Sequence, residues 1–243
     1  VDIGGNDGSL LKAFKSCTPK NLKLLNIDPC ENLVSDNNKN NIEIKTAFFN
    51  KEVASSLGKQ ADLIISTNVF QHLRDINSFI AGVKILLTPN GIWALEFPYW
   101  MHDVDSNQFD QIYHEHLYYY SVKPLNILCA KHGLKIIDIS PQSIHGGTLR
   151  IVFAHDSSNF PLSPKLPLYL DKEEKYTSTS LTTWGKNIKE YISECATFIK
   201  NLKEQGHSIA AFGAAAKGCV FLNAMNLSFT EIEYIIDDTK LKQ

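Results

Sequence analysis

The chain has 243 residues, with 24 Lys and Arg against 26 Asp and Glu, and a hydrophobic fraction of 44% that is enough for a real core. No basic run offers nucleic acid an electrostatic footprint, and no apolar run reaches the roughly 18 residues of a membrane span. The five cysteines form no CxxC pair, so we expect reduced thiols, neither disulfides nor a zinc site, and a cytoplasmic protein.

Strand-like apolar runs alternate with helix-like segments over the first hundred residues, which is typical of an α/β domain with a parallel sheet. The predicted parallel strands are 1–3, 22–27, 42–46, 62–67 and 92–97. Two later runs, 134–140 and 148–155, are joined by a short glycine-bearing segment and predict an antiparallel hairpin. We therefore expect a mostly parallel sheet that ends in a hairpin.

The domain organisation follows from where this alternation stops. Residues 98–132 form a long insertion, and such insertions in compact domains are often functional. Prolines, serines and charges over 157–177 predict a linker. We expect a first domain over 1–156, and over 178–243 a long amphipathic helix followed by the start of a second nucleotide-binding-type α/β domain, with strand, glycine turn, helix and strand.

A glycine-rich turn, GGNDG, follows the first strand and precedes a helix that should begin near Ser9. Glycine permits positive φ and close approach of the backbone to a ligand, and the next helix offers free N–H groups. The spacing of Gly4, Gly5 and Gly8 differs from the G-x-G-x-x-G dinucleotide fingerprint. With Asp2 before it, the turn is closer to the D-x-G-x-x-x-G opening of S-adenosylmethionine (SAM) methyltransferases.

Asp28 ends the second predicted strand, where a carboxylate can accept hydrogen bonds from both ribose hydroxyls of an adenosine cofactor. NAD-binding and SAM-binding folds share this arrangement, so Asp28 does not choose between them. Asn68 and His72 follow the fourth strand, at the edge where open α/β sheets bind ligands, although His72 could equally be an ordinary polar residue before the next helix. The predicted cofactor-binding residues are Asp2, Gly4, Gly5, Asn6, Gly8, Asp28, Asn68 and His72.

Three other residues near predicted strand ends have two interpretations each. Phe48 and Phe49 follow the third strand and could flank an adenine ring or pack in the core. Glu96, near the end of the fifth strand, could face the cofactor or the substrate.

The octet YHEHLYYY, residues 113–120, is the densest cluster of titratable and aromatic groups in the chain. Histidine is suited to accept a proton near neutral pH, a carboxylate can orient its ring, and a tyrosine hydroxyl can serve an oxyanion. In an extended segment Tyr113 and Glu115 would face one way and His114 and His116 the other, whereas an irregular loop could bring three together. An H-x-H pair can also ligate a metal, but no further ligands lie at a diagnostic spacing, so we predict none.

Six motifs occur in the order seen in the sugar C-methyltransferases, and the chain resembles that family along essentially its whole length: DIGGNDGSLL, NVFQHL, EFPYWM, FDQIYHEHLYYYS, HGGTLRIVFAH and FGAAAKG. These enzymes methylate nucleotide-activated 4-keto-deoxysugars. The resemblance implies a class I SAM-methyltransferase fold, SAM as cofactor and a nucleotide-linked keto sugar as substrate. Family members usually begin with a small zinc-binding domain and continue beyond this chain's end, so we expect a fragment.

The resemblance also implies roles for residues of the octet and of the HGG motif. It assigns the general base to His116, with Glu115 and Tyr113 as partners, although Glu115 could exchange roles with His116. It places His145 nearby, and we expect His145 and Gly146 at the substrate.

In the FGAAAKG turn, Gly213 lets the backbone approach a phosphate and Lys217 can supply charge, so both are predicted substrate-binding residues. An ordinary strand-to-helix turn with a solvated lysine remains the other interpretation.

Methylation of carbon needs a nucleophile, because a C–H bond has no lone pair. A carbonyl beside that carbon solves the problem, since a base can remove the α proton and a donor can stabilise the enolate oxygen. We therefore hypothesise a SAM-dependent C-methyltransferase that works through enolisation. Two alternatives remain: an NAD-dependent oxidoreductase or epimerase, which the glycine spacing and the terminal hairpin disfavour, and a non-catalytic module that binds nucleotide sugars.

Overall fold

The computed structural model describes residues 1–239 except 19–21, 40 and 59. The chain divides into two compact units, which we describe separately. Unit 1 comprises Val1–His102 and Leu117–Glu174, and unit 2 comprises Asp103–His116 and Lys175–Gln243. The predicted insertion 98–132 is therefore shared between the units.

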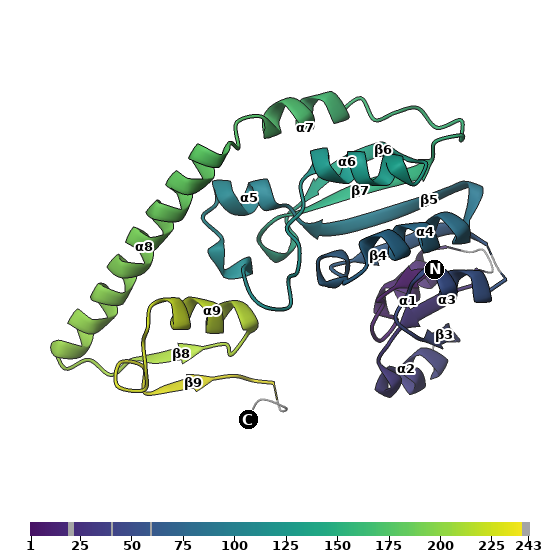
Figure 1. Ribbon diagram of the computed structural model, residues 1–243. Coiled ribbons are helices and arrows are strands. Elements are labelled where there is room, and N and C mark those ends of the chain that lie inside the picture. The colour runs from purple at the N-terminus through teal and green to yellow at the C-terminus, as the bar shows by residue number, and fades with distance from the viewer. Residues whose placement is uncertain (19–21, 40, 59, 240–243) are drawn as a thin grey trace. The chain divides into compact units, whose positions relative to one another are not determined.

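Unit 1 is built on a sheet whose described strands have the order β3-β2-β1-β4-β5-β7-β6 (Figure 1). Strands β1 to β5 pair in parallel, and β7 is antiparallel to both β5 and β6. The predicted sheet with a terminal hairpin is thus confirmed. Its strands are β1 (Asp2–Ile3), β2 (Leu25–Asp28), β3 (Glu43–Thr46), β4 (Ala61–Thr67), β5 (Leu87–Pro98), β6 (Leu134–Gln142) and β7 (Thr148–His155).

Helices connect these strands, as the alternating sequence pattern predicts. Between β4 and β5, residues 70–72 form a short 3-10 turn and α4 follows, whose start Asp75 caps by accepting a hydrogen bond from the Ser78 N–H (2.9 Å). The α-helices of unit 1 are α1 (Ser9–Cys17), α2 (Val34–Lys39), α3 (Lys51–Ser56), α4 (Ile76–Leu86), α6 (Val122–Lys131) and α7 (Leu166–Glu173), and α5 (Trp100–Asp105) crosses the boundary between the units.

The core of unit 1 centres on Trp93 in β5, which is fully buried. Its ring stacks on Phe153 of β7 with centroids 4.9 Å apart and meets Phe70 and Phe79 at 5.9 and 6.1 Å. Its indole N–H donates to the Ser66 hydroxyl (2.8 Å), so this large residue is buried without losing its polar contact. This packing holds the strand ends that carry the candidate site.

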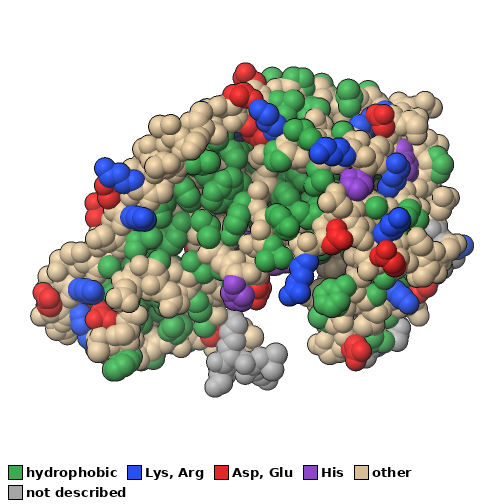
Figure 2. All heavy atoms as spheres, viewed as in Figure 1, with side chains coloured by type: hydrophobic (Ala, Val, Ile, Leu, Met, Phe, Trp, Pro, Cys, Tyr) green, Lys and Arg blue, Asp and Glu red, His purple; other side chains and the backbone are tan. Residues whose placement is uncertain are grey.

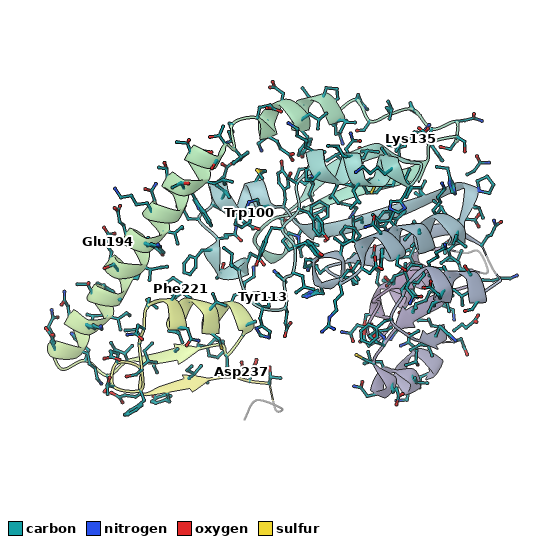
Figure 3. The ribbon with its side chains drawn as sticks, in the orientation of Figure 1. Trp100, Tyr113, Lys135, Glu194, Phe221 and Asp237 are labelled. Atoms are coloured by element: carbon teal, nitrogen blue, oxygen red, sulfur yellow. The ribbon has the colours of Figure 1, made fainter. Side chains whose placement is uncertain are left out.

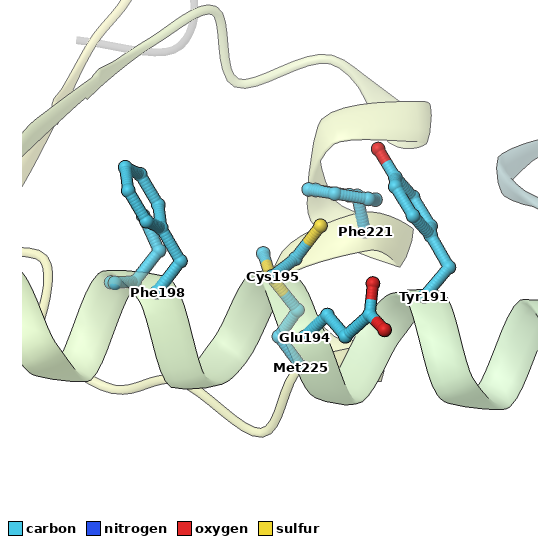
Figure 4. A pocket seen from close by; sticks show the side chains of 7 residues that line it. Tyr191, Glu194, Cys195, Phe198, Phe221 and Met225 are labelled. Atoms are coloured by element: carbon cyan, nitrogen blue, oxygen red, sulfur yellow. The ribbon is translucent and has the colours of Figure 1, made fainter.

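Unit 2 contains α8 (Ser178–Glu204), β8 (Ala210–Phe212), α9 (Ala216–Ala224) and β9 (Tyr234–Ile236), and β8 pairs with β9 in parallel. A reciprocal capping box between Thr177 and Ser180 fixes the start of α8. Figure 2 shows hydrophobic side chains gathered along α8. Part of this stripe lines an apolar cavity of about 350 Å³ with α9 (Figure 4), bounded by Tyr191, Glu194, Cys195, Phe198, Ile199, Phe221 and Met225.

Residues 103–116 belong to unit 2 although they lie far from its other residues in sequence. Asp105 accepts hydrogen bonds from the Lys175 ammonium (3.1 Å) and from the Tyr176 hydroxyl (2.7 Å). Phe109 packs against Phe221 of α9, with ring centroids 5.7 Å apart. The first part of the octet is thereby fixed to the C-terminal helices of the chain.

Candidate active site

The glycine turn between β1 and α1 is packed tightly from behind. Gly4 and Gly8 have φ of +72° and +77°, which confirms the need for glycine at both positions. A Cβ on Gly4 would lie 2.3 Å from Val69 Cγ2, and one on Gly5 would lie 2.6 Å from Asn26 Oδ1. The turn therefore requires glycine because of its own packing, independently of any ligand.

Two buried asparagines hold the turn at Asn6, which has a φ of +51°. Asn26 Nδ2 donates to the Asn6 carbonyl (2.8 Å) and to Asn37 Oδ1 (3.0 Å), and Asn37 Nδ2 donates to the same carbonyl (3.2 Å). Sequence reasoning missed this pair. The available signal was the polar Asn26 inside an otherwise apolar strand, LLNI, whose side chain needs buried partners.

Asp28 links the turn to the end of β2. Its Oδ2 accepts from the Asn6 N–H (3.0 Å) and its Oδ1 accepts from the Cys30 N–H (2.9 Å). A carboxylate oxygen can accept more than one hydrogen bond, so this geometry still allows Asp28 to accept from ribose hydroxyls. The loop and its acidic partner therefore fit an adenosine cofactor.

Other predicted cofactor residues lie at the same edge of the sheet. Asp2 is buried beside Gly5, and its Oδ1 has no hydrogen-bond partner among the described residues. Burial raises the pKa of Asp2 to about 6. Asn68 directly follows β4 and donates its N–H to the Glu96 carbonyl (2.9 Å), whereas His72 is exposed in the 3-10 turn beyond it. Cofactor contact by Asn68 and His72 stays a prediction.

The structure distinguishes the paired interpretations of Phe48 and Phe49, and it shows a structural contact of Glu96 while leaving its cofactor or substrate contact a prediction. Phe49 is buried against Phe79 (centroids 5.2 Å apart), while Phe48 is 80% exposed beyond β3. Glu96 is buried, and its Oε2 accepts from Arg150 Nε (3.0 Å) and Nη2 (2.8 Å) of its cross-strand partner on β7. Glu96 thus stabilises the β5–β7 pair, and Phe48 is the aromatic residue open to a ligand.

The octet begins with a turn and not with an extended segment. The His116 N–H donates to the Tyr113 carbonyl (3.0 Å), which brings these two side chains together. The Tyr113 hydroxyl lies 2.9 Å from His116 Nε2, and His116 Nδ1 lies 2.9 Å from the Gln111 carbonyl oxygen (Tyr113 is labelled in Figure 3). A carbonyl oxygen only accepts, so Nδ1 carries a proton, and when the ring is neutral Nε2 accepts from the Tyr113 hydroxyl.

The environment of this pair favours a neutral tyrosine beside a basic nitrogen. His116 is buried and Tyr113 is half-buried. Burial, and secondarily the charge of Glu115, raises the pKa of Tyr113, so its hydroxyl remains a donor. With the Nδ1 proton held by the Gln111 carbonyl, Nε2 is the nitrogen available to accept a proton, as a general base requires.

The remaining predicted catalytic and substrate residues are less closely grouped. Glu115 is 62% exposed, with Oε1 3.9 Å from Nε2 of the exposed His114, and its partnership with His116 stays a prediction. The His145 side chain lies outside the described residues. Gly146, in the β6–β7 hairpin, accepts a hydrogen bond at its carbonyl from His102 Nε2 (2.7 Å). A Cβ on Gly147 (φ +123°) would lie 2.2 Å from the His102 ring, so His102 packs closely against this loop and supports it. This role of His102 was not predicted from the sequence.

The FGAAAKG turn of unit 2 repeats the hydrogen bonds of the first glycine turn. Gly213 (φ +92°) donates to the Ile236 carbonyl (2.7 Å), as Gly4 does to Ile27 (2.8 Å). Asp237, after β9 (labelled in Figure 3), accepts from the Ala214 N–H at Oδ2 (2.7 Å). Its Oδ1 accepts from the Thr239 N–H (2.8 Å), as Asp28 does from Cys30.

Asp237 was not predicted from the sequence, although the run YIIDD resembles LLNID at the end of β2. Lys217 lies in the first turn of α9, a helix without a side-chain N-cap among the described residues. Free N–H groups and a lysine at a helix start suit an anion.

A membrane span and a metal centre are two other features that the described residues could form. Among these residues, no helix is both long and apolar enough to cross a membrane. No group of three or more His, Cys, Asp or Glu side chains in this part of the chain could hold a metal ion.

A seven-stranded sheet of this order, with a glycine turn and an acidic residue ending the second strand, is the architecture of the class I SAM-dependent methyltransferases. Residues 1–139 match the family model described as a methyltransferase domain, and residues 143–243 match the one described as the C-methyltransferase C-terminal domain. The chain belongs to the methyltransferases, a family of SAM-dependent enzymes, and its cofactor is SAM. Its C-terminal part is similar to the C-terminal domain of the C-methyltransferases.

Individual relatives agree with this assignment. The C-methyltransferase NovU of Streptomyces niveus is 30% identical over 252 residues, an alignment that covers 100% of this chain and 59% of NovU. The chain therefore spans less than two thirds of that relative. Among solved structures, the plantazolicin methyltransferase BpumL, in complex with a pentazolic desmethylPZN analog and SAH, has a TM-score of 0.50 and 13% identity, covering 64% of this chain and 75% of BpumL. A LepI variant in complex with SAH has a TM-score of 0.50 and 12% identity, covering 63% and 42%.

Proposed function

We propose that the protein transfers a methyl group from SAM to the α carbon of a nucleotide-linked keto-deoxysugar. Support comes from the C-methyltransferase family match and from the name of NovU, which specify carbon as the acceptor. A carbon acceptor must be made nucleophilic, and a keto group beside it allows this by enolisation. The sugar and its nucleotide rest on the resemblance of the six motifs.

In unit 1, the residues that would hold SAM are the glycine turn, Asp28 and the exposed Phe48. Asp28 would accept from the ribose hydroxyls while keeping the Asn6 N–H in place. Phe48 offers an exposed ring beyond β3 that an adenine could stack on. Bound SAM supplies an electrophilic methyl group on its sulfonium.

The contact of His116 Nδ1 with the Gln111 carbonyl oxygen (2.9 Å) is the observation that carries the mechanism. The Gln111 carbonyl fixes the proton on Nδ1, so Nε2 has the free electron pair of a base. The α C–H bond breaks, its proton goes to Nε2, and its electron pair passes into the enolate. The Tyr113 hydroxyl, which donates to Nε2 in this structure, turns to donate to the enolate oxygen. The enolate carbon would then bond to the methyl carbon while the bond from that carbon to the sulfonium sulfur breaks, so that S-adenosylhomocysteine leaves and the carbonyl re-forms.

In unit 2, the second glycine turn would hold the diphosphate of the substrate. Gly213 and Asp237 fix the shape of the turn, and the start of α9 presents N–H groups and Lys217. The Ala214 N–H already donates to Asp237, so the phosphates would bind at the helix start and not at that N–H.

Deuterium exchange tests enolisation directly. A small panel of 4-keto nucleotide sugars is incubated with the protein in deuterated water, with and without SAM, and followed by mass spectrometry. We expect deuterium uptake without SAM and methyl gain only with it. If neither mass change occurs on any sugar while SAM binds, the keto-sugar substrate is wrong.

A further inference from the structure

Asp103, on α5, is a buried carboxylate to which no described residue donates a hydrogen bond. Its side chain is 1% exposed, and neither Oδ1 nor Oδ2 has a hydrogen-bond partner among the described residues. Burying a carboxylate without donors is costly, and native proteins rarely leave one in this condition. An additional group that donates a hydrogen bond to Asp103 would remove this cost.

The surroundings of Asp103 belong to the same unit. Burial is the largest influence on its pKa, which rises to about 7; the charge of Lys217 lowers the pKa and that of Asp110 raises it. Asp103 therefore lies within electrostatic reach of the first turn of α9, on which Lys217 is half-buried. Gln111, on the same segment, is also buried, and its Nε2 has no partner within the described residues.

Packing fixes this segment against α9. Phe109, between Asp103 and Gln111, contacts Phe221 of α9, and Asp105 is bonded to Lys175 and Tyr176. Asp103 thus cannot simply turn outward to reach water without disturbing contacts on both of its sides. A fixed, unsatisfied polar group within electrostatic reach of Lys217, at an uncapped helix start, is an arrangement that suits a ligand subsite.

We propose that Asp103 and the first turn of α9 form one subsite, in which Asp103 accepts a hydrogen bond from a sugar hydroxyl while Lys217 and the helix start bind the attached phosphate. This inference rests on the proposed function. It adds to that function a residue, Asp103, that would recognise the sugar through a hydroxyl group. Above its pKa of about 7 Asp103 is negatively charged and would repel a phosphate, whereas a sugar hydroxyl can donate to its oxygens. The opposite charges of Asp103 and Lys217 therefore suit the two adjoining parts of a sugar phosphate.

A ligand role and a purely structural role predict opposite effects of Asp103→Asn. If Asp103 serves a ligand, its charge destabilises the free protein, so the variant should melt at a higher temperature and bind substrate more weakly. If an internal water or another fixed group satisfies the carboxylate, the variant should melt at a lower temperature and bind as well as the parent.

The test combines thermal unfolding with titration calorimetry. The probes are thymidine diphosphate, its conjugate with a 4-keto-6-deoxyhexose, and SAM. We expect Asp103→Asn to lower the affinity for the conjugate by roughly tenfold or more, and to leave the affinities for thymidine diphosphate and SAM within about twofold of the parent values. Lys217→Gln should weaken thymidine diphosphate and the conjugate alike. Asp110→Asn, which removes a neighbouring charge from the same segment, is the matched control and should leave all three affinities within about twofold.

Each other outcome has a defined meaning. If Asp103→Asn binds the conjugate with the affinity of the parent, the proposed subsite is wrong. The proposed subsite is also wrong if the variant loses affinity for the conjugate and for thymidine diphosphate to the same extent. If the unaltered protein binds SAM but neither nucleotide, the proposed substrate fails first and the subsite falls with it. Should Asp103→Asn not fold, Asp103→Ser is measured in its place, with the same expected split between the two nucleotides.

Discussion

The two glycine turns share two kinds of hydrogen bond in different surroundings. The glycine N–H donates to the carbonyl of the residue before the acidic one, and a later N–H of the turn donates to the acidic side chain. In unit 1, every residue of β2 is buried, and a Cβ on Gly4 would clash with Val69. In unit 2, the residues of β9 are exposed, and a Cβ on Gly213 would meet no described atom within 4 Å. The contrast shows that the glycine and the acidic residue set the local shape of the turn, while packing decides how much change the turn tolerates.

The largest expected effect is on turnover, and it tests whether catalysis depends on unit 2 while SAM binding depends on unit 1. We predict that His116→Ala lowers turnover by roughly 10²- to 10⁴-fold, the usual range for a positioned base. SAM affinity should change little, because the glycine turn and Asp28 lie in the other unit. Steady-state kinetics and SAM titration measure both quantities. His114→Ala is the control, since that side chain is 89% exposed; unaltered turnover in His116→Ala would exclude His116 as the base.

Alanine at each turn glycine tests the role of packing. Gly4→Ala combines a positive φ with overpacking against Val69, so it should lower the free energy of unfolding by roughly 2–4 kcal/mol. Gly213→Ala meets only the cost of the positive φ, roughly 1 kcal/mol. Hydrogen exchange, read by mass spectrometry for each segment, reports the two units separately. Equal effects at both positions would contradict the contrast.

The pH dependence of stability tests the buried acid of unit 2. The folded pKa of Asp103, about 7, lies above its ordinary value of 3.8, so the folded state holds this proton more tightly. Its contribution to stability is therefore fully present below about pH 4 and is lost as the pH rises towards about 7. Asp103→Asn should match the parent near pH 4 and exceed its unfolding free energy by roughly 2–4 kcal/mol near pH 8. Urea unfolding across this range measures the difference, and a constant difference would refute the assignment.

The smallest effect compares the two acidic residues directly. Asp28→Asn should weaken SAM binding by roughly tenfold, because an amide would lose charge-assisted hydrogen bonds to the turn and to ribose. Asp237→Asn should leave SAM affinity unchanged. It should lower the affinity for thymidine diphosphate by a few-fold, because the hydrogen bond from the Ala214 N–H that holds the second glycine turn would be weaker. Calorimetry with both ligands on both variants gives the cross-comparison. Loss of SAM affinity in Asp237→Asn would show that the units are not independent.

The sheet was predictable because its strands are apolar runs separated by helical periods. Strand ends were less so. Leu22 to Leu24 read as strand, but β2 begins at Leu25, where its register with β3 starts, and its register with β1 starts one residue later, at Asn26. Pairing depends on the neighbouring strands, which a single run does not reveal.

The site was predictable by residue type and less by contact. His116 and Tyr113 were identified from the sequence, but the contact between their side chains depends on a turn that the residue pattern of the octet does not predict. The Asn26–Asn37 pair and the bonds of Asp105 to Lys175 and Tyr176 join residues 11 to 71 positions apart. Such contacts come from tertiary structure, which local patterns do not encode.

The crossing of residues 103–116 into unit 2 also bears on how such enzymes can recombine. A hybrid joined after Glu174 would take Lys175 and Tyr176 from one parent and their partner Asp105 from the other. The base would then be separated from the helices against which its segment is fitted. Exchange of acceptor preference between relatives should therefore require that two stretches of gene, distant in sequence, be inherited together.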